Sequence, residues 1–322
     1  MNEKILVTGG FGFIGSHFLV AALKQDKDLV VIDDFSNSYE DIVGRVENIT
    51  GKKIAYEQLD ITDKDKLARF FETQDIDSVV HFAGKKSVEE SMEKPAAYYA
   101  TNVGGTINLI DQCLKHKVKK FIFSSSATVY EGNPAPFRED MPIKESSNPY
   151  GETKIICDRI LEGIAKTTDK MQVTILRYFN PIGNLPGLRE NPKQPAKNII
   201  PILNQIAEGE IKELLIFGDD YNTKDGTAER DYIHILDLVD AHLVALDYTG
   251  EKYNVFNIGV GRGISVKELV QAYEIANNVD IPRRTVGRRP GDLEVSFTDT
   301  GKASQILGWK AQYSLEEMLK IH

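Results

Sequence analysis

The sequence of 322 residues predicts an α/β fold, in which a doubly wound parallel sheet is followed by a smaller C-terminal domain. Three observations favour this fold. Short apolar, β-branched runs alternate with longer amphipathic stretches, as in parallel strands joined by helices. The first run, at 4–8, leads directly into a glycine cluster and then a helical pattern. A serine run, Ser124 to Ser126, ends another apolar run, and open parallel sheets bind their ligands at such strand ends.

The turn after the first strand has the composition of a dinucleotide-binding loop. Gly9, Gly12 and Gly15 lie between a strand and a helix. Glycine lets the backbone turn tightly and approach a pyrophosphate, whose charge then lies at the helix N-terminus. The next strand, at 29–32, ends in Asp33, about twenty residues after this turn, where a carboxylate is expected to bind the adenosine ribose. A carboxylate there would repel a 2′-phosphate, so a Rossmann-type domain that binds NAD is favoured; a turn-favouring pair, Asp33-Asp34, is the alternative.

Further strands are expected at 53–61, 78–84, 119–126 and 172–180, and helices at 63–72, 96–118 and from Tyr150 to about 166. Gly104 and Gly105 are unfavourable within the long helix, so they indicate close packing or the approach of the cofactor loop. After Pro181 several prolines break the chain into shorter elements. We therefore expect a dinucleotide-binding domain at 1–180, and mainly a substrate-binding domain at 181–322 with some segments that return to the main sheet.

Composition excludes several classes of protein. The net charge of −9 argues against a general nucleic-acid surface, which needs a basic footprint. No apolar run has the length needed to span a membrane, and the first strand begins too early for a signal peptide. The two cysteines, Cys113 and Cys157, form neither a disulfide framework nor a metal-ligand spacing. We expect a cytoplasmic protein without a metal.

The candidate catalytic residues are Tyr150, Lys154 and Ser126. A tyrosine and a lysine four residues apart share one helical face. A phenol has an ordinary pKa near 10 and is a poor base at neutral pH. One positive charge about 6 Å away, at an effective dielectric constant near 20, stabilises a phenolate by roughly 3 kcal/mol. Lys154 and an oxidised nicotinamide ring would supply two such charges, so Tyr150 is predicted to transfer protons; a surface Tyr/Lys pair is the alternative.

These motifs, in order along nearly the whole chain, resemble those of the extended short-chain dehydrogenase/reductases and, more narrowly, the UDP-glucose 4-epimerase family. The resemblance rests on TGGFGFIGSH, DDFSNS, VVHFAGKKSVEES, YYATNVGGT, FIFSSSATVY, NPYGETK, LRYFNPIG, FGDDYNTKDGTAERDYIH and RRPGDLEVSFTD. The DGTAERDYIHILDL and RRPGD segments are far more specific than the glycine pattern.

The resemblance implies two sets of site residues. The NAD-binding set comprises Gly9, Gly12, Phe13, Ile14, Gly15, Asp33, Asp34, Phe35, Ser36, Asn37, Ser38, Asp60, Ile61, Phe82, Ala83, Gly84, Lys86, Asn102, Ser124, Tyr150, Lys154 and Phe179. The UDP-hexose-binding set comprises Lys86, Ser126, Tyr150, Asn180, Asn198, Ile199, Ile200, Leu215, Ile216, Phe217, Arg230, Tyr232, Arg289, Asp292 and Ser296. Ser125 is the rival of Ser126, because the loop that leads to Tyr150 is shorter than usual in the family.

The resemblance also implies a mechanism: interconversion of UDP-glucose and UDP-galactose by hydride transfer to NAD and back through a 4-keto sugar. Ser296 stands where some members carry a bulky tyrosine, so UDP-GlcNAc and UDP-GalNAc are expected to be accepted too. Helices near Pro95 and Tyr150 carry apolar residues on more than one face, which is typical of a homodimer. The alternatives are another nucleotide-sugar enzyme of the superfamily and a non-catalytic NAD-sensing protein.

Overall fold

The computed structural model describes residues 3–188, 198–289 and 293–321, and it confirms the predicted α/β fold. A sheet of seven parallel strands has the order β11-β6-β5-β4-β1-β2-β3. Its strands are β1 (Lys4–Thr8), β2 (Asp28–Asp33), β3 (Ala55–Gln58), β4 (Ser78–His81), β5 (Lys120–Ser126), β6 (Gln172–Tyr178) and β11 (Tyr253–Ile258). The order reverses beside β1, which is the topology of a doubly wound sheet.

Helices cover both faces of this sheet. On one face, the helix residues Leu67 and Leu109 share a core cluster with the strand residues Leu6 and Phe121. On the opposite face, the helix residues Phe18 and Leu238 belong to a second core cluster. The first face is covered by α3 (Lys64–Thr73), α6 (Thr106–Lys115) and α7 (Pro149–Thr167), and the second by α1 (Phe13–Lys24), α2 (Asp41–Thr50) and α9 (Ile235–Asp247). The sheet therefore lies between two helical layers, as the alternation of strands and helices predicts.

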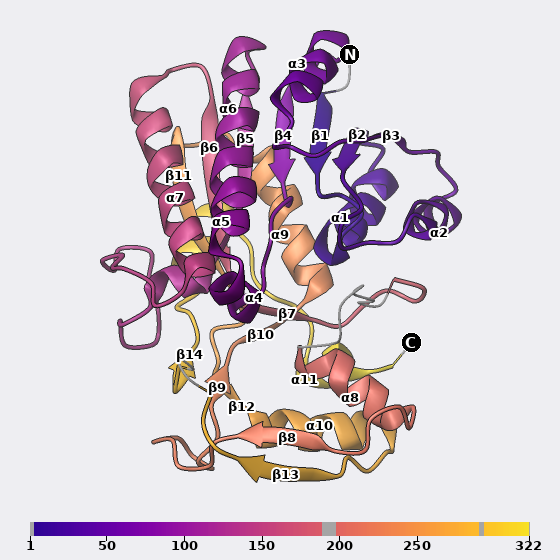
Figure 1. Cartoon of the computed structure of the whole chain (residues 1–322), viewed down its shortest axis with the longest axis vertical. Coiled ribbons are helices and arrows are strands. Elements are labelled where there is room, and N and C mark those ends of the chain that lie inside the picture. The colour runs from indigo at the N-terminus through magenta and orange to yellow at the C-terminus, as the bar shows by residue number, and fades with distance from the viewer. Residues whose placement is uncertain (1–2, 189–197, 290–292, 322) are drawn as a thin grey trace.

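The C-terminal part contains smaller sheets below the main one (Figure 1). The pairs are β7 (Asn180–Ile182) with β10 (Tyr232–His234), and β8 (Leu214–Phe217) with β13 (Arg283–Val286); β9 (Glu229–Arg230) lies between β12 (Ile264–Ser265) and β14 (Val295–Ser296). Three helices, α8 (Ile199–Ala207), α10 (Val266–Asn277) and α11 (Leu315–Leu319), complete this part. The strand arrows of β1 and β4 point toward it in Figure 1, so the ligand-binding edge of the main sheet faces the C-terminal part.

Several local predictions need correction. The strand predicted at 172–180 ends at Tyr178, and Asn180 starts the separate strand β7. The long helix predicted at 96–118 consists of α5 (Pro95–Tyr98), a π-helical segment at Tyr99–Gly105 and α6, and it ends at Lys115. Short helices α2 and α4 (Val88–Glu93) lie where no helix was expected.

The predicted close packing at the glycine pair is confirmed for Gly105. A methyl group at Gly105 would lie 2.6 Å from a side-chain carbon of Ile61, too close for any real contact. The glycine therefore lets the π-helical segment approach the loop after β3. Among the helices of the described ranges, none has both the length and the apolar character that a membrane crossing requires.

Candidate active site

The turn between β1 and α1 has the shape that a pyrophosphate requires. Gly9 has a φ of +65°, and a methyl group there would lie 2.6 Å from the backbone nitrogen of Ala83. A methyl group at Gly15 would lie 2.4 Å from the carbonyl oxygen of Gly9. Gly12 immediately precedes α1, whose first turn carries no acidic side chain to repel an anion. Backbone N–H groups at this helix N-terminus, flanked by Phe13 and Ile14, can therefore receive a phosphate.

The loop after β2 places Asp33 at the predicted adenosine end. Its buried carboxylate accepts hydrogen bonds from the backbone N–H groups of Phe11 (2.9 Å) and Phe35 (2.8 Å). Burial raises the pKa of Asp33, and these hydrogen bonds oppose the shift. Phe35 has a positive φ of 55° and stacks on Phe11 with ring centroids 5.2 Å apart. The loop therefore turns at this point and holds the Asp33 carboxylate in place, and the contact of that carboxylate with an adenosine ribose stays a prediction.

The other predicted adenosine contacts surround this carboxylate. Ser38 is buried and donates to Asp33 at 3.4 Å, whereas Ser36 and Asn37 are exposed. Asp34 and Asp60 are exposed, and each accepts a hydrogen bond from a backbone N–H two residues further on. The predicted contacts therefore line the ends of β2 and β3, and their role toward a cofactor stays a prediction.

Asn102 links the end of β4 to α7. Its side-chain oxygen accepts a hydrogen bond from the Lys85 N–H (2.8 Å), and its amide nitrogen donates to the Lys85 carbonyl (3.0 Å) and to the Thr153 hydroxyl (3.0 Å). It lies in the π-helical segment, and such irregular turns frequently occur at functional sites. The segment from Phe82 to Lys86 is thereby fixed beside the helix that carries Tyr150.

The structure brings Tyr150, Lys154 and Ser126 to the same edge of the sheet. Helix α7 begins after Asn148, whose side chain accepts a hydrogen bond from the Gly151 N–H (2.8 Å), and Pro149 occupies its first position. Lys154 is only 8% exposed; its Nζ donates to the Ser124 carbonyl (2.8 Å) and lies 4.9 Å from the ring centre of Phe123.

This hydrogen bond fixes the ammonium group next to the end of β5. Ser126 is the last residue of β5, pairs with Tyr178 of β6, and is half-buried like Tyr150. Tyr178 was missed by the sequence analysis. Burial raises the pKa of Tyr178 well above its ordinary value, and the nearby Tyr150 adds to the shift. Its position at the carboxyl end of a strand, directly before Phe179, is the signal that could have identified it.

A buried polar chain underlies these residues. Arg177 of β6 and Asp158 of α7 form an ion pair of 2.9 Å, with side chains that are 3% and 2% exposed. Arg177 also donates to the hydroxyl of Tyr130 (2.8 Å), and that hydroxyl donates to Oδ1 of Asn257 (2.7 Å) on β11. The helix that carries Tyr150 is therefore held to β6 and β11 and to the segment that follows Ser126.

The predicted substrate residues come together in pairs. Arg230 and Ser296 are direct neighbours across β9 and β14, and Asn180 and Tyr232 across β7 and β10. The guanidinium of Arg289 lies 4.1 Å from the ring centre of Phe217. These pairs contain guanidinium groups and an aromatic ring, which are suited to a diphosphate and a base.

The remaining predicted contacts are placed less uniformly. Asn198 precedes α8, and Ile199 and Ile200 are half-buried in its first turn. Leu215 is exposed, but the neighbouring side chain of Ile216 is buried in the C-terminal core, so only the Ile216 backbone could face a ligand beside Leu215. Asp292 lies outside the described residues.

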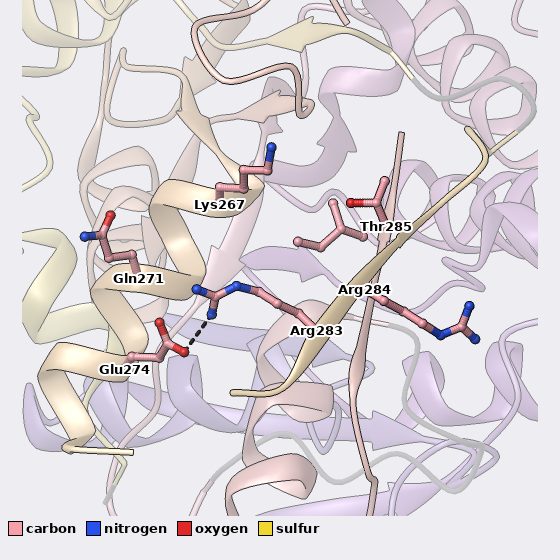
Figure 2. A pocket seen from close by; sticks show the side chains of 7 residues that line it. Lys267, Gln271, Glu274, Arg283, Arg284 and Thr285 are labelled. Atoms are coloured by element: carbon pink, nitrogen blue, oxygen red, sulfur yellow. Dashed lines mark hydrogen bonds and ion pairs between the residues drawn. The ribbon is translucent and has the colours of Figure 1, made fainter. Parts of the chain in front are cut away.

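A surface hollow of about 540 Å³ lies elsewhere, between α10 and β13 (Figure 2). It is lined by Ile216, Lys267, Gln271, Glu274, Arg283, Arg284 and Thr285. Arg283 and Glu274 point toward each other across it and form an ion pair of 2.6 Å. The hollow is on the α10 side of the small sheet, and Ile216 is the only member of its lining in the predicted site.

Comparisons with known proteins agree with this geometry. The sequence profile of the NAD dependent epimerase/dehydratase family matches residues 5–259. The UDP-glucose 4-epimerase of Pasteurella multocida (strain Pm70) is 45% identical over 322 residues, which cover 98% of this chain and 95% of that protein.

Two solved structures show the same likeness in three dimensions. The UDP-glucose 4-epimerase from Bifidobacterium longum, in complex with NAD+ and UDP, has a TM-score of 0.94 and 41% identity over 98% of this chain and 96% of that chain. The UDP-Glc/GlcNAc 4-epimerase of Campylobacter jejuni has a TM-score of 0.86 and 37% identity over 99% and 97%. The chain therefore belongs to the NAD dependent epimerase/dehydratase family, among its UDP-glucose 4-epimerases.

Proposed function

We propose that this protein interconverts UDP-glucose and UDP-galactose by inverting carbon 4 of the hexose, with NAD as its cofactor. One observation carries the proposal. The chain resembles UDP-glucose 4-epimerases over nearly its whole length, and the predicted Tyr150, Lys154 and Ser126 belong to the start of α7 and the carboxyl end of β5, which the Lys154 hydrogen bond joins.

The residues present fit NAD. The turn at Gly9 and Gly15 leaves no room for a side chain, α1 presents its N-terminus to that turn, and the carboxylate of Asp33 is fixed at the end of β2. The chemistry that a bound NAD supplies is reversible hydride transfer at carbon 4 of the hexose.

The protein's own groups move the proton and hold the substrate. Tyr150 would take the proton of the 4-hydroxyl and later return it to the 4-keto sugar, with Ser126 hydrogen-bonded to the same oxygen. The buried ammonium of Lys154, fixed on the Ser124 carbonyl, would supply a positive charge one helical turn from Tyr150. Arg230 and Arg289 would bind the diphosphate. Both lie in 181–322, which we propose as mainly the substrate-binding domain, and 1–180 is the proposed cofactor domain.

An activity assay tests this function. Purified protein is incubated with UDP-galactose, and UDP-glucose is measured with a coupled dehydrogenase; Tyr150→Phe should lower the rate by roughly 10²- to 10⁴-fold while the protein retains NAD. A different product would identify another nucleotide-sugar enzyme. NAD-loaded protein without any product would favour an NAD-sensing role.

Acetylated sugars are a second substrate class that we propose. Ser296 is small, buried and adjacent to Arg230 across the strand pair. A small side chain there leaves space for a 2-acetamido group beside the anchored diphosphate. Ser296→Tyr should lower activity on UDP-GlcNAc far more than on UDP-galactose, and equal activity of this variant on both sugars contradicts the proposal.

The assembly that we propose is a homodimer. Met92, Tyr99 and Ile107 are 61%, 37% and 45% exposed, on α4, the π-helical segment and α6. Exposed apolar side chains on these helices favour burial against a second copy. Light scattering should give twice the chain mass, and Ile107→Glu should give monomers; a wild-type monomer at micromolar concentration contradicts the dimer.

The free, buried cysteines Cys113 and Cys157 favour the reducing cytoplasm as the location of the protein, which cell fractionation tests.

A further inference from the structure

Asp231 lies at the junction of the main sheet and the substrate-binding region. It stands between Arg230 and Tyr232 in the sequence, and its side chain is completely buried. Its backbone N–H donates to the Ser296 carbonyl (2.9 Å), and its carbonyl accepts a hydrogen bond from the Asn180 N–H (3.0 Å). The main chain of one residue thus connects three segments that carry predicted substrate contacts.

The carboxylate of Asp231 binds two further loops. Oδ1 accepts a hydrogen bond from the Val260 N–H (2.8 Å), and Oδ2 accepts hydrogen bonds from the N–H groups of Gly261 (2.9 Å) and Thr298 (3.3 Å). Val260 and Gly261 follow β11 of the main sheet, and Thr298 follows the strand that carries Ser296. A single carboxylate therefore joins the loop after β11 of the main sheet to the segment that follows β14.

Burial of a charged carboxylate costs free energy, and hydrogen bonds to the carboxylate offset part of that cost. Burial raises the pKa of Asp231 to about 6, although three backbone N–H groups oppose this shift. The surrounding loop is also shaped for the carboxylate. A methyl group at Gly259 would lie 2.6 Å from Oδ2 of Asp231 and 2.7 Å from a methyl carbon of Thr298. The loop therefore closes directly on this side chain.

We propose that Asp231 is a positioning residue for substrate binding, because its carboxylate fixes the segments that carry Arg230 and Ser296 to the loop after β11. β11 pairs with β6, and β6 with the strand that ends in Ser126. Asp231 thus fixes the position of Arg230, a proposed diphosphate-binding residue, relative to Ser126, without itself contacting the substrate. This inference rests on the proposed epimerase function and deepens it.

Asp231→Asn tests the proposal, with Asp237→Asn as the matched control. The amide keeps the size of the side chain but presents an NH₂ group to backbone N–H donors. Asp237 is also a buried carboxylate, and it accepts hydrogen bonds from the N–H groups of Gln312 (2.9 Å) and Tyr313 (3.2 Å) in the C-terminal segment. Both variants should lower the midpoint of thermal unfolding.

Substrate binding separates the two variants. For Asp231→Asn we expect the Kd of UDP, measured by calorimetry, and the KM of UDP-galactose to rise at least tenfold, while kcat changes less than threefold and NAD is retained. For Asp237→Asn both constants should stay within twofold of wild type. If Asp231→Asn lowers the melting midpoint as the control does but leaves KM and Kd within twofold, the residue is merely structural and the proposal is overturned.

Gly259→Ala provides an independent second variant in case Asp231→Asn does not fold. Its methyl group presses on the same carboxylate, and Gly259 has no positive φ that alanine would strain. A weaker affinity for UDP supports the proposal, and an unchanged one overturns it. UDP binding does not require turnover, so these results are distinct from the failure of the proposed function, which a wild-type protein unable to convert UDP-galactose would show.

Discussion

The buried ion pair between Asp158 and Arg177 allows a quantitative test of how α7, the helix that carries Tyr150, is held in place. Asp158→Asn keeps the shape of the side chain but leaves the guanidinium of Arg177, which is only 3% exposed, without its counter-charge. Removal of one partner from a buried pair costs about 3 to 5 kcal/mol, because the remaining charge stays desolvated. We expect a loss of this size in the free energy of unfolding.

The expected shift in melting temperature follows from the chain length. An unfolding entropy of about 2.1 cal/mol/K per residue gives roughly 0.7 kcal/mol/K for the 322 residues. A loss of about 3 to 5 kcal/mol therefore lowers the midpoint by about 4 to 7 °C. Differential scanning calorimetry of the wild-type and variant proteins, both loaded with NAD, measures this difference.

Two further variants make the test decisive. Asp111→Asn removes an ion pair with Lys115 whose side chains are 55% and 60% exposed, so the midpoint should change by less than about 1 °C. Asp158→Asn combined with Arg177→Met removes both buried charges and should recover part of the loss. An Asp158→Asn protein that melts within about 1 °C of wild type refutes the reasoning, as does a double variant less stable than the single one.

Three other outcomes are expected. Gly15→Ala should yield protein without bound NAD, seen as a lower ratio of absorbance at 260 and 280 nm, because its methyl group would lie 2.4 Å from the Gly9 carbonyl oxygen; retention of NAD contradicts this. Tyr130→Phe should cost about 1 to 3 kcal/mol in urea unfolding, since it leaves Arg177 and Asn257 each without a partner hydroxyl. Because the pKa of Asp231 is about 6 in the folded protein against 3.8 ordinarily, the folded state gains protons first as the pH falls. Urea melts at pH 7.5 and pH 5 should therefore show wild type gaining about 1.4 kcal/mol relative to Asp231→Asn at the lower pH, and no gain contradicts the burial effect.

Local patterns made much of the fold predictable. The strand at 4–8 and the glycine turn after it are predictable from a short stretch of sequence, because strand, turn and helix signals follow one another directly. The same holds for Tyr150 and Lys154, whose spacing alone places them on one face of α7. Their common edge with Ser126 follows from the parallel topology, in which all strand ends lie on one side.

The contacts that fix these residues were not predictable, because they depend on long-range packing. The hydrogen bond of Lys154 joins it to a carbonyl 30 residues earlier, and Arg177 reaches Tyr130 across 47 residues. The expected long helix is split by a π-helical segment, from which Asn102 reaches the Lys85 backbone 17 residues earlier. Asp231 carried only a weak signal, because it directly follows the charged residues Glu229 and Arg230, and nothing in this local pattern indicates that its carboxylate is buried.

The buried polar residues form one connected frame around the proposed site. Beyond Tyr130, the amide of Asn257 donates to the Phe137 carbonyl (3.1 Å), which also accepts a hydrogen bond from the Thr298 hydroxyl (3.1 Å). Thr298 donates its N–H to Asp231, so hydrogen bonds run from the helix that carries Tyr150 to the strand of Arg230.

An epimerase must hold its nucleotide firmly while the hexose turns, so rigidity has to come from outside the sugar pocket. Apolar packing would stabilise the fold as well as this frame does, but directional hydrogen bonds fix relative positions more uniquely. The frame therefore holds the helix of Tyr150, the proposed proton-transfer residue, and the strand of Arg230 in fixed relative positions.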